Sequence, residues 1–183
     1  MILHGRTVKK GTAEGEAIVS RLPFSFLGDL DVNTGRVTPR GHDLEGQSIA
    51  GKIFVFATGK GSTVGPNVAY QAKQRGNAPR GMICIEVEPV MAMVAIMNDI
   101  PMVHKLDLNP LDVIETGDYV KMDATNGIVE VYQEGRGFAA LNTVPPCVIR
   151  LSTLVAAIDP GRARTRKPTP VQALRQLPRD GTL

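Results

Sequence analysis

The first part of the chain contains short, unbroken apolar runs, which predict buried strands. They lie at 52–57 (KIFVFA), 81–87 (GMICIEV) and 101–104 (PMVH). Runs of this length, rich in β-branched and aromatic residues, are typical of strands covered on both faces. A fourth run at 17–20 (AIVS), which follows Gly15, also predicts a strand.

Two segments between these runs carry helix signals. The first opens with Pro66 at a first helical position, continues as an apolar stripe, and ends before Gly76. The second, 89–99 (PVMAMVAIMND), also opens with proline and is apolar at nearly every position, which predicts a helix buried all round. Strands alternating with helices in this order imply a parallel sheet with right-handed crossovers.

The remaining patterns are less regular. Residues 118–133 alternate apolar and polar positions around a turn at 123–127, which predicts a hairpin. Residues 22–46 contain many turn formers and little periodicity, so we expect a long loop without regular structure, of the kind that often carries function. Residues 1–137 are therefore predicted to form one α/β domain with β-rich flanks.

The C-terminal segment 138–183 differs from this body in composition. It holds 7 basic and 2 acidic residues, a net charge of +5, whereas residues 1–137 hold 14 and 16, a net charge of −2. It also holds 6 of the 13 prolines, so we expect a Pro/Arg-rich extension that is largely disordered. A basic arm that contacts RNA or membrane is the alternative. Because the body has no basic stripe, nucleic acid is not an expected partner.

Composition narrows the protein class further. The chain is 43% hydrophobic but only 4% aromatic, which predicts an aliphatic core. Cys84 and Cys147 form neither a metal-type spacing nor a disulfide framework, and Cys84 within its apolar run is expected to be a small buried side chain. No apolar run reaches the ~20 residues of a membrane helix, and no signal peptide is evident, so we expect a cytoplasmic protein. The histidines show no metal-ligand spacing and are expected to be structural or solvated: His4, His42 and His104.

A glycine-rich loop, FATGKGSTVGPNV (56–68), lies between a predicted strand and a predicted helix. Loops at this position bind ligands in many α/β proteins, and helix N-termini favour anions. The phosphate-loop pattern fails because Lys60 stands between Gly59 and Gly61. The dinucleotide pattern fails because the spacing to Gly65 is one residue too long.

Ser62 in this loop allows two interpretations. Unpaired N–H groups at the helix start would stabilise its ionised form, and positive charge from Lys60 or a metal centre would complete a base. Alternatively, Ser62 or Thr63 only caps the helix. Glu86 and Glu88, at the end of the second apolar run, are expected to be solvated or to position a loop.

Four stretches together resemble the small, swivel-type subunit of aconitase X. They are LPFSFLGDLDVNTGRV, GQSIAGKIFVFATGKGSTVGPNVAYQ, NAPRGMICIEVEPVMAMVAIMNDIPMV and GDYVKMDATNGIVEV, spread in order over about residues 1–133. The resemblance implies the swivelling β/β/α fold shared with the fourth domain of aconitase and the small subunit of isopropylmalate isomerase. It also implies a heterodimer with a large subunit that carries an iron–sulfur cluster, with no cofactor bound by this chain.

The resemblance also implies a hydro-lyase activity and a site. The serine of the GKGST motif, here Ser62, would be the proton acceptor, and the cluster of the large subunit would hold the leaving hydroxyl. The loop over residues 24–31 would contact substrate or partner. Further residues of the glycine-rich loop are expected to bind the substrate: Lys60, Gly61, Thr63 and Gly65.

The expected substrate is (R)-5-phosphomevalonate, dehydrated to trans-anhydromevalonate 5-phosphate in the mevalonate route to isoprenoids. Thr63 favours it over cis-3-hydroxy-L-proline, because hydroxyproline enzymes more often carry cysteine after the serine. Pro66 departs from the family pattern and changes the rim of the loop. Two other classes stay open: a non-catalytic swivel module for binding or assembly, and a phosphate- or nucleotide-binding enzyme.

Overall fold

The computed structural model describes residues 1–133 of the 183-residue chain. The predictions for residues 138–183 and for Cys147 lie outside this range. The elements along the described part are β1 (Ile2–His4), β2 (Arg6–Lys9), β3 (Thr12–Ser20), α1 (Phe26–Asp29), β4 (Ile53–Phe56), α2 (Gly65–Gln74), β5 (Gly81–Cys84), α3 (Pro89–Met97), β6 (Met102–His104), α4 (Pro110–Val113), β7 (Tyr119–Asp123) and β8 (Ile128–Tyr132).

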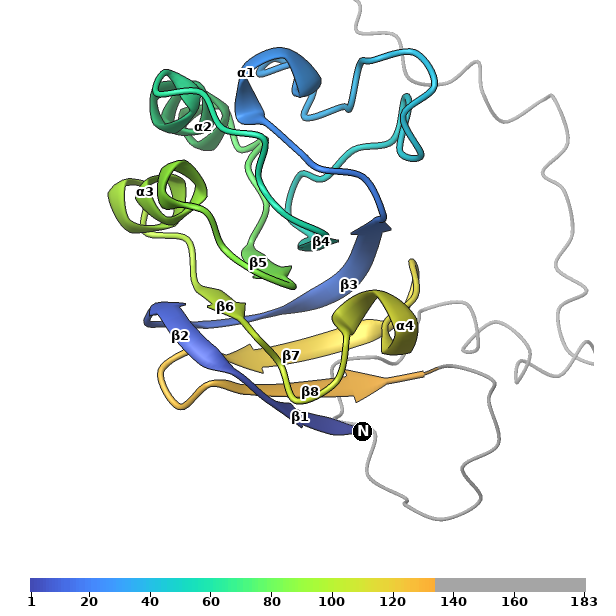
Figure 1. The fold of residues 1–183 in the computed structure, drawn as a ribbon. Coiled ribbons are helices and arrows are strands. Elements are labelled where there is room, and N and C mark those ends of the chain that lie inside the picture. The colour runs from blue at the N-terminus through green and yellow to red at the C-terminus, as the bar shows by residue number, and fades with distance from the viewer. Residues whose placement is uncertain (134–183) are drawn as a thin grey trace, which may run out of the picture. The chain divides into compact units, whose positions relative to one another are not determined.

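The strands are ordered β1-β8-β7-β3-β4-β5-β6-β2. The last part of β3 pairs with β4 in parallel, and β4, β5 and β6 continue the parallel arrangement with α2 and α3 as crossovers. The first part of β3 instead pairs antiparallel with β7. β3 therefore belongs to both halves of the sheet, and the antiparallel half folds beneath the parallel half (Figure 1).

Two hydrophobic cores lie on opposite faces of the parallel strands. Phe54 and Phe56 face the core on the helix side, whereas Ile53 and Val55 of the same strand face the core shared with the antiparallel strands. Because both faces are covered, β4 shows the unbroken apolar run that the sequence predicted as a buried strand. This layering of sheet, sheet and helices confirms the β/β/α expectation.

Residues 22–46 form a long and mostly irregular loop, as the sequence predicted. The segment contains the short helical turn α1 and several isolated β-bridges. It also contributes buried side chains to the helix-side core: Phe24, Phe26, Leu30, Val37 and Leu44. Their irregular spacing follows the turns of the chain rather than one helix or strand, and therefore produces no periodic pattern.

The helix predicted over 89–99 is present as α3, but the expectation that it is buried all round was wrong. Met93, Ile96 and Met97 are 49%, 56% and 60% exposed. The opposite side of the helix packs into the core through Met91, Val94 and Ala95. α3 thus lies on the outside of the layer with one apolar side uncovered by the described residues.

The hairpin predicted over 118–133 is confirmed as β7 and β8. The strands β1 and β2 and the short helix α4 were not predicted. β1 adds to the edge of the hairpin, and β2 pairs antiparallel with β6. Across residues 1–133, the helices are all too short or too polar to cross a membrane.

Candidate active site

The carboxyl ends of the parallel strands meet at one edge of the sheet. The register aligns the last residues of the four strands: Ser20, Phe56, Cys84 and His104. The segments that leave this edge are therefore neighbours, and they include the glycine-rich loop after β4. This is the position at which open α/β folds bind ligands.

The glycine-rich loop is joined to the segment that contains α1. The N–H of Phe24 donates to the carbonyl of Thr58, and the N–H of Lys60 donates to the carbonyl of Phe24, each at 3.0 Å. The Lys60 Nζ lies 2.9 Å from Oδ2 of Asp29, which also accepts the N–H of Ser25 at 2.9 Å. Asp29 is only 4% exposed, so this ion pair anchors the loop to a buried carboxylate.

The carboxylate of Glu88 lies so close to the glycine-rich loop that it explains why positions 59 and 61 are glycines. Glu88 is the N-cap of α3 and accepts the N–H groups of Val90 and Met91 at 2.9 and 2.8 Å. A Cβ atom at Gly59 would lie 2.5 Å from Glu88 Oε1, and one at Gly61 would lie 3.1 Å from Oε2. The loop therefore rests directly on the cap, and Glu88 has the loop-positioning role expected of it.

Glu86 takes the other expected role, that of a solvated side chain. It is exposed and lies 2.7 Å from Lys105 Nζ. The hydrogen bond and the charge of Lys105 lower the pKa of Glu86.

Ser62 does not cap helix α2. The N-cap residue is Val64, and no side chain bonds to the first helical N–H groups, so the interpretation of Ser62 or Thr63 as a cap was wrong. Ser62 Oγ instead accepts the N–H of Val64 at 3.4 Å, while the Ser62 carbonyl accepts the N–H of Gly65 at 2.7 Å. Ser62 is partly exposed.

The backbone around Ser62 offers hydrogen-bond donors. Within residues 1–133, the N–H groups of Gly61, Ser62 and Thr63 donate to no protein acceptor. Donors in this arrangement stabilise negative charge on a bound oxygen or on the serine itself. Lys60 adds a positive charge beside the same loop, but Asp29 offsets much of it.

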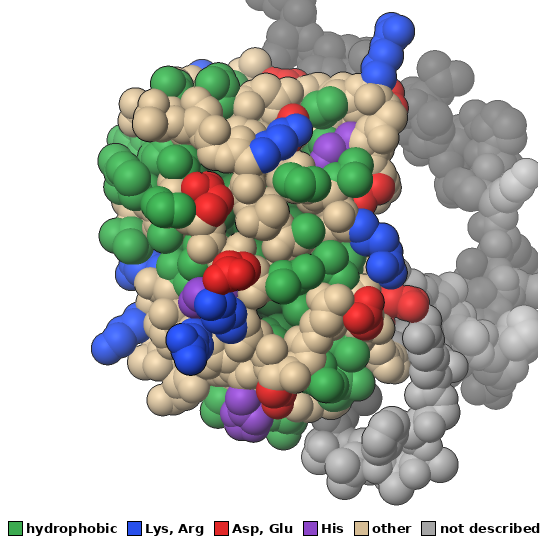
Figure 2. Space-filling model, in the orientation of Figure 1, with side chains coloured by type: hydrophobic (Ala, Val, Ile, Leu, Met, Phe, Trp, Pro, Cys, Tyr) green, Lys and Arg blue, Asp and Glu red, His purple; other side chains and the backbone are tan. Residues whose placement is uncertain are grey.

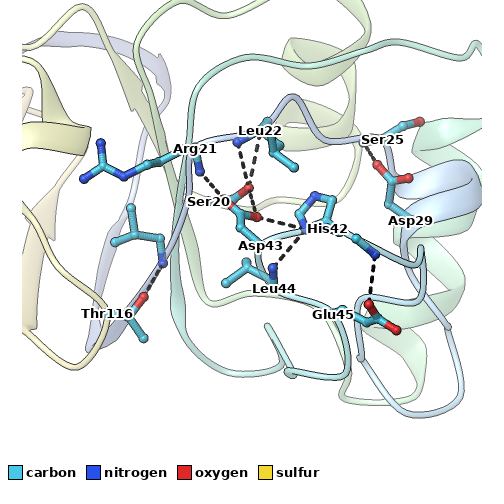
Figure 3. A network of polar contacts seen from close by, with 12 residues as sticks. Ser20, Arg21, Leu22, Ser25, Asp29, His42, Asp43, Leu44, Glu45 and Thr116 are labelled. Atoms are coloured by element: carbon cyan, nitrogen blue, oxygen red, sulfur yellow. Dashed lines mark hydrogen bonds and ion pairs between the residues drawn. The ribbon is translucent and has the colours of Figure 1, made fainter.

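A second polar network lies under the loop from 39 to 46 (Figure 3). Asp43 accepts the hydroxyl of Ser20 at 2.8 Å and the N–H of Arg21 at 2.6 Å, and its Oδ1 lies 2.9 Å from His42 Nδ1. Although these residue types occur in catalytic triads, Ser20 is fully buried and donates to the carboxylate rather than to the imidazole. The network therefore fixes the loop to the end of β3, a structural role for His42.

The described residues form no metal site. Among residues 1–133, no three His, Cys, Asp or Glu side chains come together as ligands. Cys84 is buried, and this burial, followed by the charges of Glu86 and Glu88, raises the pKa of its thiol to about 12. Cys84 is thus a neutral, buried side chain as expected, and the residues at hand do not fit an iron–sulfur cluster.

Comparison with known proteins places the chain in a family. A family model for the aconitase X swivel domain matches residues 2–131. The chain belongs to the aconitase X swivel domain family. This match confirms the resemblance carried by the four sequence stretches, and it covers the elements described above except for the last residue of β8, Tyr132.

Relatives in the aconitase X family span nearly the same length as the body of this chain. A protein of Thermococcus kodakarensis named phosphomevalonate dehydratase small subunit is 50% identical over 135 residues, or 74% of this chain and 99% of that protein. A protein of Methanosarcina mazei with the same name is 45% identical over 135 residues, or 74% and 94%. The crystal structure of holo-form aconitase X from Thermococcus kodakaraensis superposes with a TM-score of 0.69 at 49% identity, covering 73% of this chain and 99% of that one.

Proposed function

We propose that this chain is the small subunit of a phosphomevalonate dehydratase, a hydro-lyase of the aconitase X type. The observation that carries the proposal is its 44–50% identity to archaeal proteins of that name over nearly their whole length. The substrate is (R)-5-phosphomevalonate and the product trans-anhydromevalonate 5-phosphate. The name "small subunit" of these relatives supports a heterodimer with a large subunit, which in this proposal carries the iron–sulfur cluster.

Ser62 is the proton acceptor in this proposal. Its Oγ takes the proton from the carbon next to the substrate carboxylate, the C–H electron pair forms the double bond, and the C–O bond to the hydroxyl breaks. The hydroxyl leaves as water after gaining a proton. The free N–H groups of Gly61 and Thr63 would favour the ionised serine or the substrate oxyanion, because donors near a developing charge lower its free energy.

The other loop residues would hold and shape the site. Lys60, fixed by Asp29, presents its ammonium at the edge of the loop, where it would attract the carboxylate or phosphate of the substrate. Gly65 is buried at the start of α2 beside Val90, and it would contribute its backbone to the site. Thr63 follows the serine, and it favours phosphomevalonate over cis-3-hydroxy-L-proline as the substrate.

The test is reconstitution of the full chain with its large subunit, followed by assay of both substrates side by side. We expect the wild-type pair to consume mevalonate 5-phosphate. The Ser62→Ala pair should have a kcat about 10²–10⁴-fold lower, which is the usual contribution of a general base. Ser48→Ala serves as the control, because it removes a hydroxyl from a loop outside the site. Turnover of the Ser62→Ala pair at near the wild-type rate excludes Ser62 as the base, and an inactive wild-type pair favours a non-catalytic module.

A further inference from the structure

The helix α3 has a composition that is unusual for a helix at a protein surface. Its nine residues, PVMAMVAIM, include no charged or polar side chain. Helices that are apolar all round are normally buried on every side. Yet the side formed by Met93, Ile96 and Met97, spaced as i, i+3 and i+4, is about half exposed; we refer to these three residues as the α3 apolar face.

The exposed apolar area extends beyond α3. Tyr70 on the neighbouring helix α2 is 55% exposed, and Val64 at the end of the glycine-rich loop is 48% exposed. Figure 2 shows hydrophobic side chains gathered on the side of the molecule that α2 and α3 form. With about 200 Å² for a fully exposed side chain of this size, the five residues expose roughly 500 Å². Patches above a few hundred Å² mark interaction sites.

The location of this surface identifies the partner. The first turn of α3 borders the loop that carries Ser62, since a Cβ atom at Gly61 would lie 3.2 Å from Val90 Cγ2 and one at Gly65 would lie 3.7 Å from Val90 Cγ1. A subunit that presents substrate to Ser62 must therefore approach next to α3. A stable interface buries about 800 Å² on each partner; at the same ~200 Å² per side chain, the α3 apolar face alone would supply about 330 Å², and Tyr70 and Val64 would raise this to roughly 500 Å².

We propose that the α3 apolar face is a docking surface for the large subunit, which would meet it with an uncharged, apolar surface of its own. The inference rests on the proposed function, because that function supplies the second subunit. Two methionines in the face suit this role, as methionine is enriched and charge is depleted at the centres of interfaces. Docking there would cover the uncharged helix and place the large subunit against the rim of the Ser62 loop.

The test compares two surface variants of the full chain, each reconstituted with the wild-type large subunit. Met93→Glu/Ile96→Glu places two charges on the α3 apolar face at exposed positions where helix formation tolerates glutamate. Leu108→Glu is the matched control, because Leu108 is 50% exposed and lies between β6 and α4. We expect the double variant to bind the large subunit at least ~100-fold more weakly in a titration, and the control to bind within about threefold of wild type. Unchanged circular dichroism and melting temperature verify that both variants fold.

The outcomes separate this inference from the proposed function. Weakened pairing with activity restored at high subunit concentration supports the docking surface. Wild-type affinity of the double variant, or no binding by the wild-type chain, overturns it. If the isolated chain forms a dimer that the double variant abolishes while large-subunit binding is unchanged, a second copy is the occupant and the inference is wrong. A wild-type pair that forms but dehydrates neither substrate refutes the proposed function alone.

Discussion

Substitution of Gly59 by alanine tests the contact between the glycine-rich loop and the cap of α3. The added Cβ would lie 2.5 Å from Oε1, 2.8 Å from Cγ and 3.0 Å from Cδ of Glu88. All three separations are well inside van der Waals contact. Glu88 must therefore leave its position, and the two N–H groups that it accepts lose their partner.

The expected effect is a loss of about 2 kcal/mol in the free energy of unfolding. Loss of an N-cap typically costs about 1 kcal/mol, and crowding of a packed position costs about 1–3 kcal/mol more. The lower part of that range applies here because a carboxylate at the end of a side chain can turn aside. Gly65→Ala is the control, since its nearest contacts of 3.7 and 3.9 Å are ordinary. That variant should be neutral or slightly stabilising.

A double-mutant cycle measures the effect by urea unfolding of the full chain. In a Glu88→Ala background, the crowding atoms are gone and the cap is already lost, so Gly59→Ala should change stability by less than about 0.5 kcal/mol. The coupling energy between the two positions should then exceed about 1 kcal/mol. Equal destabilisation of wild type and Glu88→Ala by Gly59→Ala would refute the assignment of this glycine to the Glu88 contact.

Two further predictions concern charged groups at the same edge of the sheet. In urea unfolding at pH 7, Lys60→Met should lower the free energy of unfolding more than Asp29→Asn does, because it leaves a buried carboxylate without its cation. Adding Asp29→Asn to Lys60→Met should restore part of the lost stability. If the destabilising effects of the two substitutions simply add, the ion pair between these residues is contradicted. Burial and the charge of Lys105 lower the pKa of His104 in the folded chain from its ordinary value of 6.5. As the pH falls, the unfolded chain is therefore protonated at this position before the folded chain. The free energy of unfolding should then decrease as the pH drops below 6.5 towards the folded-state pKa. His104→Gln should reduce the change in the urea midpoint between pH 7.5 and 5.5. If the midpoint of this variant depends on pH as strongly as that of the wild type, His104 is not the source of the dependence.

The sequence predicted the central parallel strands and their helices because their signals are local. Unbroken apolar runs and prolines at helix starts report burial and capping within a few residues. β1 and β2 escaped prediction because their pairing depends on strands more than 90 residues away, such as His104 opposite Arg6. Their own sequences are short and partly polar, and resemble loops.

The candidate site was predicted unevenly for the same reason. The position of Ser62 at a strand–loop–helix corner followed from the pattern, whereas the role of Asp29 did not. Asp29 lies 31 positions before Lys60, in a segment without periodicity, and only the folded chain brings them together. Glu88 gave a usable signal, because an acidic residue immediately before a helix that opens with proline is a plausible N-cap. The exposure of α3 could not be predicted, since composition does not distinguish a monomer core from an interface.

The placement of β3 between the two halves of the sheet has a consequence for how the protein is made. The first residues of the chain pair with the last strands of the body: Ile2 lies opposite Glu130, and Thr12 opposite Asp123. These partners leave the ribosome more than 100 residues later, so the N-terminal strands have unpaired edges during most of synthesis. Such distant pairing slows folding and prolongs the time during which unpaired strand edges are exposed and can pair with other chains. Completion of the domain therefore waits for the hairpin of β7 and β8, and a nascent chain that stalls before residue 118 will be prone to aggregation.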